Sequence, residues 1–253
     1  MITKCEKCGA KYEDEYRSIV CPHNAFPAND GNNVFTTHDD AYLEQPAGGS
    51  GVYDADYFLR GKETGKSLYS NYRWLPELTL PMVNSIIAHL GIKQSDTILD
   101  FGCARGYTVK ALRQLGYNAY GYDISQWALE NADPQVRGYL IANESTMYTG
   151  DFDWVIAKDV LEHVRSIDEV VDMLKYVSRV GVFAVVPLAH CSEYDVPDYE
   201  KDVTHVHRRP LSWWVGCFHQ SGWSVEGRYR VNGVKDNYAQ YPMGNGFITA
   251  RRI

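Results

Sequence analysis

Residues 97–125 hold the pattern that most limits how this chain can fold. The segment reads TILDFGCARGYTVKALRQLGYNAYGYDIS. An apolar run ends at Asp100 and leads into a glycine turn, after which Val109 and Leu112 lie at helical spacing. Gly116 is expected to end this helix. A second short run then ends in another acid, Asp123, and Ser125 is placed to cap the next helix. This order of strand, turn, helix and strand is typical of the nucleotide-binding half of a doubly wound parallel sheet. We therefore expect an α/β fold with a ligand site at the carboxyl ends of its strands.

The glycines of this turn restrict which nucleotide can bind. A pyrophosphate-binding turn has the spacing G-x-G-x-x-G, whereas the glycines here are Gly102 and Gly106. A carboxylate at Asp100 would repel a phosphate but attract an ammonium or sulfonium group. Asp123 follows at about the 20-residue spacing that is typical of an acid that binds ribose hydroxyls. The pattern predicts a nucleoside ligand with a cationic tail.

These residues resemble the first motif of the class I S-adenosylmethionine-dependent methyltransferases, an acid followed by G-x-G-x-G. The chain has Asp100, Gly102, Ala104 and Gly106, with alanine, the smallest substitution, in place of the middle glycine. Residues 151–164, DFDWVIAKDVLEHV, resemble the fourth strand of that family and the turn after it. A different Rossmann-like domain, which binds another ligand or none, is the alternative interpretation.

The resemblance covers roughly residues 70–253. It implies a doubly wound, mostly parallel seven-stranded sheet, in which residues 224–231 and 247–252 form an antiparallel hairpin. It also implies a set of residues that bind S-adenosylmethionine, drawn from both motifs, the strand ends and an aromatic segment before them. These are Asp100, Gly102, Cys103, Ala104, Gly106, Asp123, Ile124, Asn143, Lys158, Asp159, Tyr72 and Arg73.

The aromatic segment spans residues 53–74. In similar methyltransferases an aromatic N-terminal segment folds over the cofactor, which implies that Tyr69, Tyr72 and Arg73 contact the carboxylate of the cofactor or cover it. The alternative is a surface helix whose aromatic side chains pack on the core.

Three parts of the chain are expected: a zinc-knuckle-like arm (1–45), a linker with the aromatic cap segment (46–80), and the methyltransferase domain (81–253). Within the domain, we expect a helix from Pro81 that ends before Gly91, and a helix opened by a capping box at Ser166 and Glu169. The remaining expected elements are strands at 118–122, 138–142, 154–157 and 180–186 and a helix at 212–220.

The first three of the six cysteines indicate a metal site. Cys5 and Cys8 form a C-x-x-C-G knuckle, and Cys21 and His23 follow at a spacing that completes a tetrahedral zinc set. His38 is an alternative fourth ligand, and free thiols on an arm without metal are the alternative to the site as a whole. A region this short has little hydrophobic core of its own and needs a bound metal ion to stabilise its fold.

Composition excludes some classes of protein. The chain has 253 residues, a net charge of −7 and 45% hydrophobic residues, which suit one α/β domain with a small appendage. No apolar run reaches the roughly 18 residues of a membrane span, and the start MITKCEKC does not resemble a signal peptide. We therefore expect a cytoplasmic protein. The negative charge makes nucleic acid an unlikely partner.

Histidine is the residue type best suited to remove a proton from an oxygen or nitrogen acceptor. His163 lies in the L-E-H-V turn, beside the cofactor in similar enzymes. His205 and His207 lie in D-V-T-H-V-H after the fifth strand, and similar D-x-T-H stretches occur in methyltransferases of small molecules and sugars. We expect His205 to be the base or an acceptor-binding group, and His163 and His207 are the other candidates. The alternatives are a loop-capping hydrogen bond, or a divalent ion held by His205 and His207 with Asp202 or Asp159.

The sequence therefore favours a methyltransferase that acts on a hydroxyl of a small molecule or sugar conjugate. A nucleic-acid or protein methyltransferase that docks through the zinc knuckle, and a non-catalytic protein that binds the cofactor, are the alternatives. No motif identifies the acceptor, and the oligomeric state is not encoded in any pattern we recognise. The N-P-P-Y motif expected for amino groups on bases is absent, which favours an oxygen acceptor.

Overall fold

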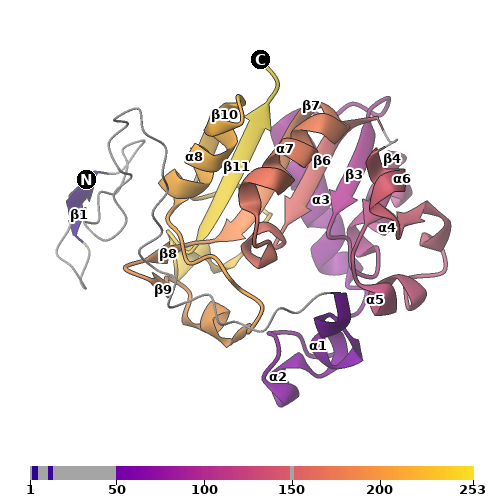
Figure 1. Cartoon of the computed structure of the whole chain (residues 1–253), viewed down its shortest axis with the longest axis horizontal. Helices are drawn as coiled ribbons and strands as arrows, with labels where there is room; N and C mark the ends of the chain where they lie inside the picture. Colours follow the sequence, from indigo (N-terminus) through magenta and orange to yellow (C-terminus); the bar gives the residue numbers. More distant parts are fainter. Residues whose placement is uncertain (1, 5–10, 14–49, 149–150) are drawn as a thin grey trace.

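The computed structural model describes residues 2–4, 11–13, 50–148 and 151–253 (Figure 1). The expected zinc ligands Cys5, Cys8, Cys21 and His23, and the alternative ligand His38, lie outside the described residues. Strands β1 (Ile2–Lys4) and β2 (Lys11–Glu13) flank the segment with the first two cysteines and pair antiparallel to each other.

A seven-stranded sheet organises the rest of the chain, in the order β10-β11-β7-β6-β3-β4-β5. Strand β11 is antiparallel to both of its neighbours, and the other pairings are parallel. The doubly wound fold expected from the sequence is therefore confirmed, including the antiparallel hairpin at the end. The strands are β3 (Thr97–Phe101), β4 (Asn118–Tyr122), β5 (Leu140–Ile141), β6 (Phe152–Lys158), β7 (Ser178–Pro187), β10 (Ser224–Arg228) and β11 (Asn245–Arg251).

Helices cover both faces of this sheet (Figure 1). On one face, α3 (Pro76–Leu90) and α4 (Tyr107–Gln114) bury Ile86 and Leu112 completely. On the other face, α7 (Ile167–Val177) and α8 (Leu211–Gln220) contribute Leu174 and Trp214 to the second cluster of buried residues. Each such side chain contributes about 1.5–3 kcal/mol when it leaves water. The two cores hold the sheet rigid and leave its carboxyl edge for a site.

Shorter elements surround the sheet. They are α1 (Ala55–Leu59), α2 (Gly61–Thr64), α5 (Gln126–Glu130) and α6 (Glu144–Tyr148), the hairpin of β8 (Ala189–His190) with β9 (Glu193–Tyr194), and several single-turn 3₁₀ helices. Among the described residues, none of the helices has both the length and the apolar composition needed to cross a bilayer.

Helix α3 begins earlier than the sequence indicated. The expected start at Pro81 is wrong, because Pro76 occupies the first turn and Pro81 lies inside the helix. An interior proline removes the backbone hydrogen bond to the residue four positions before it. The helix continues because Val83, Ile86 and Leu90 are buried against the sheet.

Helix α7 begins where the capping box placed it, but not with the expected bond. Ser166 is the N-cap residue, yet its side chain accepts no capping hydrogen bond, and only its backbone carbonyl accepts one, from Val170 N–H. The strand expected at 138–142 is reduced to β5, because a 3₁₀ helix at Arg137–Tyr139 takes up the residues before it. The strand expected at 224–231 ends at Arg228.

Candidate active site

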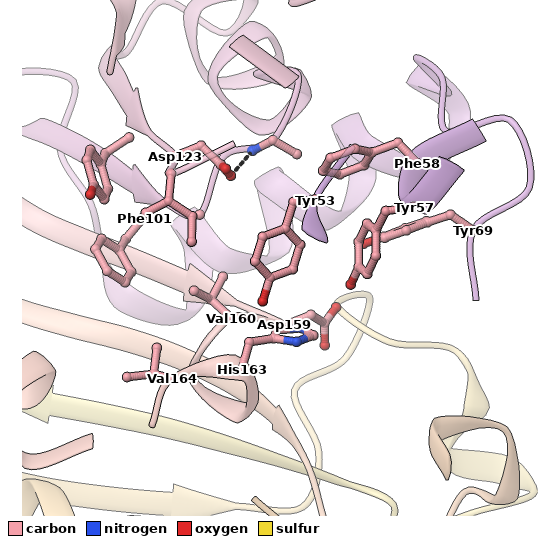
Figure 2. A pocket seen from close by; sticks show the side chains of 14 residues that line it. Tyr53, Tyr57, Phe58, Tyr69, Phe101, Asp123, Asp159, Val160, His163 and Val164 are labelled. Carbon is pink, nitrogen blue, oxygen red and sulfur yellow. Dashed lines mark hydrogen bonds between the residues drawn. The ribbon is translucent and has the colours of Figure 1, made fainter. Parts of the chain in front are cut away.

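A pocket of about 680 Å³, measured with its open mouth, lies at the carboxyl ends of β3, β4 and β6. The turn after each of these strands contributes to its wall. The aromatic segment that contains α1 and α2 covers the other side (Figure 2).

The glycine turn after β3 forms one wall of the pocket. Gly102 has a φ of +79°, and a Cβ placed there would lie 2.3 Å from Cγ2 of Val160, in the turn after β6. Only glycine therefore allows the two turns to pack together. Ala104, at the position of the middle glycine of the motif, also has a left-handed φ of +48°.

Asp123 faces the pocket from the end of β4. Its Oδ2 accepts a hydrogen bond from Ala104 N–H at 2.7 Å (Figure 2). Its Oδ1 accepts one from Ser125 N–H at 2.7 Å. Burial raises the pKa of this carboxyl, and the two N–H groups act against that rise. Each carboxylate oxygen has two lone pairs, so the group can still accept hydrogen bonds from a ligand.

The aromatic cap consists of Tyr53, Tyr57, Phe58 and Tyr69, which line the pocket opposite the strand ends. The ring of Tyr57 contacts those of Tyr53, Phe58 and Tyr69 edge to face, with 5.0 Å between the centroids of Tyr53 and Tyr57, whereas Phe58 and Tyr69 stack on each other. Phe58 also stacks on Trp127 at 5.5 Å. Figure 2 shows the hydroxyls of Tyr53 and Tyr57 directed toward the side where His163 lies.

Backbone and side-chain hydrogen bonds tie this cap to the domain. Ser125 Oγ donates to the carbonyl of Tyr53 at 2.6 Å, and it also accepts from Ala128 N–H at 3.0 Å, as the expected cap of α5. Arg105 donates to the carbonyl of Tyr72 at 2.9 Å. The cap is therefore fastened to the elements that carry the pocket.

His163 lines the pocket from a 3₁₀ turn at Leu161–His163. Its Nδ1 lies 2.8 Å from Thr204 Oγ1, and Thr204 Oγ1 donates to Asp202 Oδ1 at 2.6 Å. Because the threonine proton is used on the carboxylate, the threonine oxygen accepts from Nδ1–H of the imidazole. Burial lowers the pKa of His163. The histidine is therefore neutral, with its free lone pair on Nε2.

The same carboxylate connects the histidine to the cap. Tyr57 O–H donates to Asp202 Oδ2 at 3.0 Å, in a site where both side chains are buried. Asp202 thus receives hydrogen bonds from the cap and from the residue that orients His163.

A second charged group on the pocket wall is Asp159, which follows β6 with a φ of +56°. Its carboxylate accepts a hydrogen bond from Lys235 at 2.7 Å and is also paired with Lys158. These two ammonium groups hold the pKa of Asp159 well below its usual range despite burial. Glu162, three residues later, shows the opposite effect, because burial and the nearby Asp159 raise its pKa well above the usual value.

His205 and His207 do not converge. His205 is buried behind His163, with 4.8 Å between the two ring centroids. His207 Nε2 lies 2.5 Å from the carbonyl of Val164, and its ring packs on Trp213. The alternative in which both histidines hold one metal ion is wrong, because residues 204–210 form a loop and not an extended strand.

Of the twelve expected cofactor residues, five line the pocket: Gly102, Ala104, Asp123, Ile124 and Asp159. The others do not. Asp100 is buried beneath the turn, where burial and Asp123 raise its pKa to about 7. Arg73 is exposed, and Asn143 Oδ1 accepts from Ser145 N–H instead. Cys103, Gly106, Lys158 and Tyr72 also lie outside the lining.

Several lining residues were not expected from the sequence. Phe101, Tyr122, Val160 and Val164 form apolar wall next to the motif residues. Their place in the sequence could have identified them, because each lies next to or close to a strand end that the motifs had already placed.

Comparison with known proteins agrees with this architecture. A family model described as a methyltransferase domain matches residues 77–226, more than half of the chain. No curated protein matches the chain significantly.

Solved structures share the fold at low sequence identity. The magnesium protoporphyrin IX methyltransferase of Synechocystis PCC 6803, with bound S-adenosylmethionine, is 15% identical, covers 81% of this chain and 98% of its own, and has a TM-score of 0.54. An S-adenosylmethionine-dependent methyltransferase of Archaeoglobus fulgidus is 14% identical, with coverages of 70% and 97% and a TM-score of 0.51. The plantazolicin methyltransferase BpumL, in complex with S-adenosylhomocysteine, is 15% identical, with coverages of 70% and 85% and a TM-score of 0.53. The chain belongs to the methyltransferase domain family and is an S-adenosylmethionine-dependent methyltransferase.

Proposed function

We propose that the protein transfers the methyl group of S-adenosylmethionine to a hydroxyl of a small molecule or sugar conjugate, with His163 as the general base. The observation that carries this proposal is the orientation of His163. The imidazole lines the pocket, donates its Nδ1 proton to Thr204, and leaves the Nε2 lone pair free.

The residues present fit the cofactor. The free lone pairs of Asp123 suit the ribose diol, and the apolar wall of Phe101, Ile124 and Val164 suits a purine ring. Gly102 and Ala104, both with a left-handed φ, place the backbone of the glycine turn on the pocket wall. Tyr72 and Arg73 would contact the ligand only after movement of residues 53–74 toward it.

The cofactor, when bound, supplies an already activated methyl group for in-line displacement. The protein then has three tasks. The aromatic cap and the strand ends hold the acceptor in line and keep water out. Nε2 of His163 accepts the proton that the acceptor hydroxyl loses. Asp202, through Thr204, keeps the imidazole in the tautomer that can accept it.

The enclosed aromatic site supports a small acceptor. Four aromatic side chains cover the pocket, and the cap is fastened by hydrogen bonds at Tyr53, Tyr57 and Tyr72. Two proteins of similar fold are named for small substrates, magnesium protoporphyrin IX and plantazolicin. A net charge of −7 does not favour broad contact with nucleic acid.

The test uses S-adenosylmethionine labelled at the methyl group and a panel of hydroxylated small molecules and glycosides. We expect label in the small-molecule fraction, in a product that withstands alkali as a methyl ether does. His163→Gln should slow the transfer by about 10²–10⁴-fold, while S-adenosylhomocysteine binding and the rate of the His219→Gln control stay unchanged, because His219 is exposed on α8. Label found only in protein or nucleic acid would overturn the proposal.

A further inference from the structure

A cluster of metal-ligating side chains lies at the edge of the pocket. Glu162, His163 and His205 each offer one ligand atom, and these atoms all lie within 4.8 Å of one another. Two imidazoles and one carboxylate are a donor set that suits late first-row divalent ions. His163 also lines the pocket, so an ion held there would be next to the acceptor.

Two atoms of this cluster lack the hydrogen bonds that buried polar atoms normally make. Glu162 Oε2 and His205 Nδ1 have no partner among the described residues. The two side chains are only 1% and 5% exposed. A buried carboxylate oxygen and a buried imidazole nitrogen that are both left open in this way indicate a missing ligand.

The second nitrogen of His163 is held by a hydrogen bond, and the second nitrogen of His205 faces a carboxylate. His163 donates from Nδ1 to Thr204, which donates to Asp202. His205 Nε2 lies 4.0 Å from Asp202 Oδ2. Metal-ligating histidines are typically oriented by such partners at the nitrogen that does not bind the metal.

We propose that Glu162, His163 and His205 form a site for a divalent ion of the zinc class, and that the ion inhibits methyl transfer. The inhibition rests on the proposed function, because the ion takes the Nε2 lone pair with which His163 would accept the proton. The binding itself does not depend on it. Zinc bonds of about 2.0–2.2 Å place tetrahedral ligands about 3.3 Å apart, so the side chains close by about 1.5 Å on binding.

Binding is measured by titrating the metal-free full-length chain with Co²⁺ and following its visible absorption. The wild type should bind one equivalent more than Glu162→Gln and than His205→Gln, whatever the cysteines of the N-terminal segment bind. His207→Gln is the matched control from the same loop, since its Nε2 lies against the carbonyl of Val164, outside the cluster, and it should bind as much as the wild type. Thermal melting and S-adenosylhomocysteine binding show that each variant is folded. Equal equivalents in all four folded proteins would overturn the site.

Inhibition is measured as the methyl-transfer rate against added Zn²⁺, with each protein normalised to its own metal-free rate. The wild-type rate should fall as the site fills and return with chelator. The half-inhibiting concentration should rise at least about tenfold in Glu162→Gln, since even residues that only support metal ligands change affinity 10–100-fold. A rate that stays constant or increases at full occupancy would refute the inhibitory role. Failure of the proposed function would appear separately, as no histidine-dependent transfer in the metal-free enzyme.

Discussion

The hydrogen-bond network around His163 leads to its most specific prediction at Thr204. Thr204 Oγ1 lies 2.8 Å from His163 Nδ1 and 2.6 Å from Asp202 Oδ1. Thr204→Val keeps the shape of the side chain but removes both hydrogen bonds. The Nδ1 proton then has no acceptor in a buried site, and the tautomer with the proton on Nε2, which cannot act as a base, becomes competitive.

The expected size of the effect follows from the lost partner. A buried donor left without an acceptor costs about 1–3 kcal/mol. If this energy favours the wrong tautomer, the rate of the chemical step falls about 5- to 150-fold. The loss must stay below that of His163→Gln, because removing the base itself costs about 10²–10⁴-fold.

Single-turnover transfer of labelled methyl, measured across pH, gives the rate of this step. Thr204→Ser is the control, because it retains the hydroxyl, and it should keep most of the wild-type rate. The affinity for S-adenosylhomocysteine should be unchanged in both variants, since Thr204 does not line the pocket. A wild-type rate in Thr204→Val, or an equal loss in Thr204→Ser, would refute the reasoning.

Four further predictions concern single residues. Gly102→Ala places a Cβ 2.3 Å from Val160 at a φ of +79°, so it should reduce the free energy of unfolding by about 2–4 kcal/mol in urea titrations, whereas Gly138→Ala, which meets open space, should have little effect. Tyr57→Phe leaves one oxygen of the buried Asp202 with a lost hydrogen bond and should lower stability by about 1.5–3 kcal/mol; an unchanged urea midpoint would contradict the link between cap and base. Burial lowers the pKa of His163, so its neutral form persists below the ordinary pKa of about 6.5. The value of kcat/KM should therefore be constant above about pH 6.5 and fall only below it. A fall that begins above about pH 7 would exclude His163 as the base. His207 has a folded pKa of about 4 because of burial, so the unfolded chain binds the proton more readily and stability should fall as pH drops from about 6.5 to 4, a slope that His207→Gln should reduce.

Local sequence patterns were sufficient to predict the nucleotide-binding half of the fold. Strand β4 and the N-cap at Ser125 lie where the sequence placed them, because turn residues and short-range spacing determine both. The left-handed Gly116 follows the end of α4 for the same reason. The helix start predicted at Pro81 was wrong, because burial of the helix that contains this proline outweighed the preference of proline for the first turn.

Less of the candidate site could be predicted from the sequence, because the site depends on the conformation of loops. His205 and His207 are two residues apart, and only the course of the loop decides that one faces His163 and the other Trp213. The bond from Tyr57 to Asp202 joins residues 145 positions apart, and no local pattern encodes such a pairing. The sequence pattern identified Asp100 as an acid at the end of a strand, but it did not predict that Asp100 is buried beneath the turn.

The central claim is that His163 removes a proton from an acceptor oxygen while the methyl group is transferred. The most direct measurement uses S-adenosylmethionine with a ¹³C-labelled methyl group and follows the label by NMR in the presence of wild type or His163→Gln, with metal removed. The account predicts a methoxyl resonance that grows with the wild type and about 10²–10⁴-fold more slowly with the variant. A resonance of an N-methyl or S-methyl product, or equal rates for the two proteins, would contradict it.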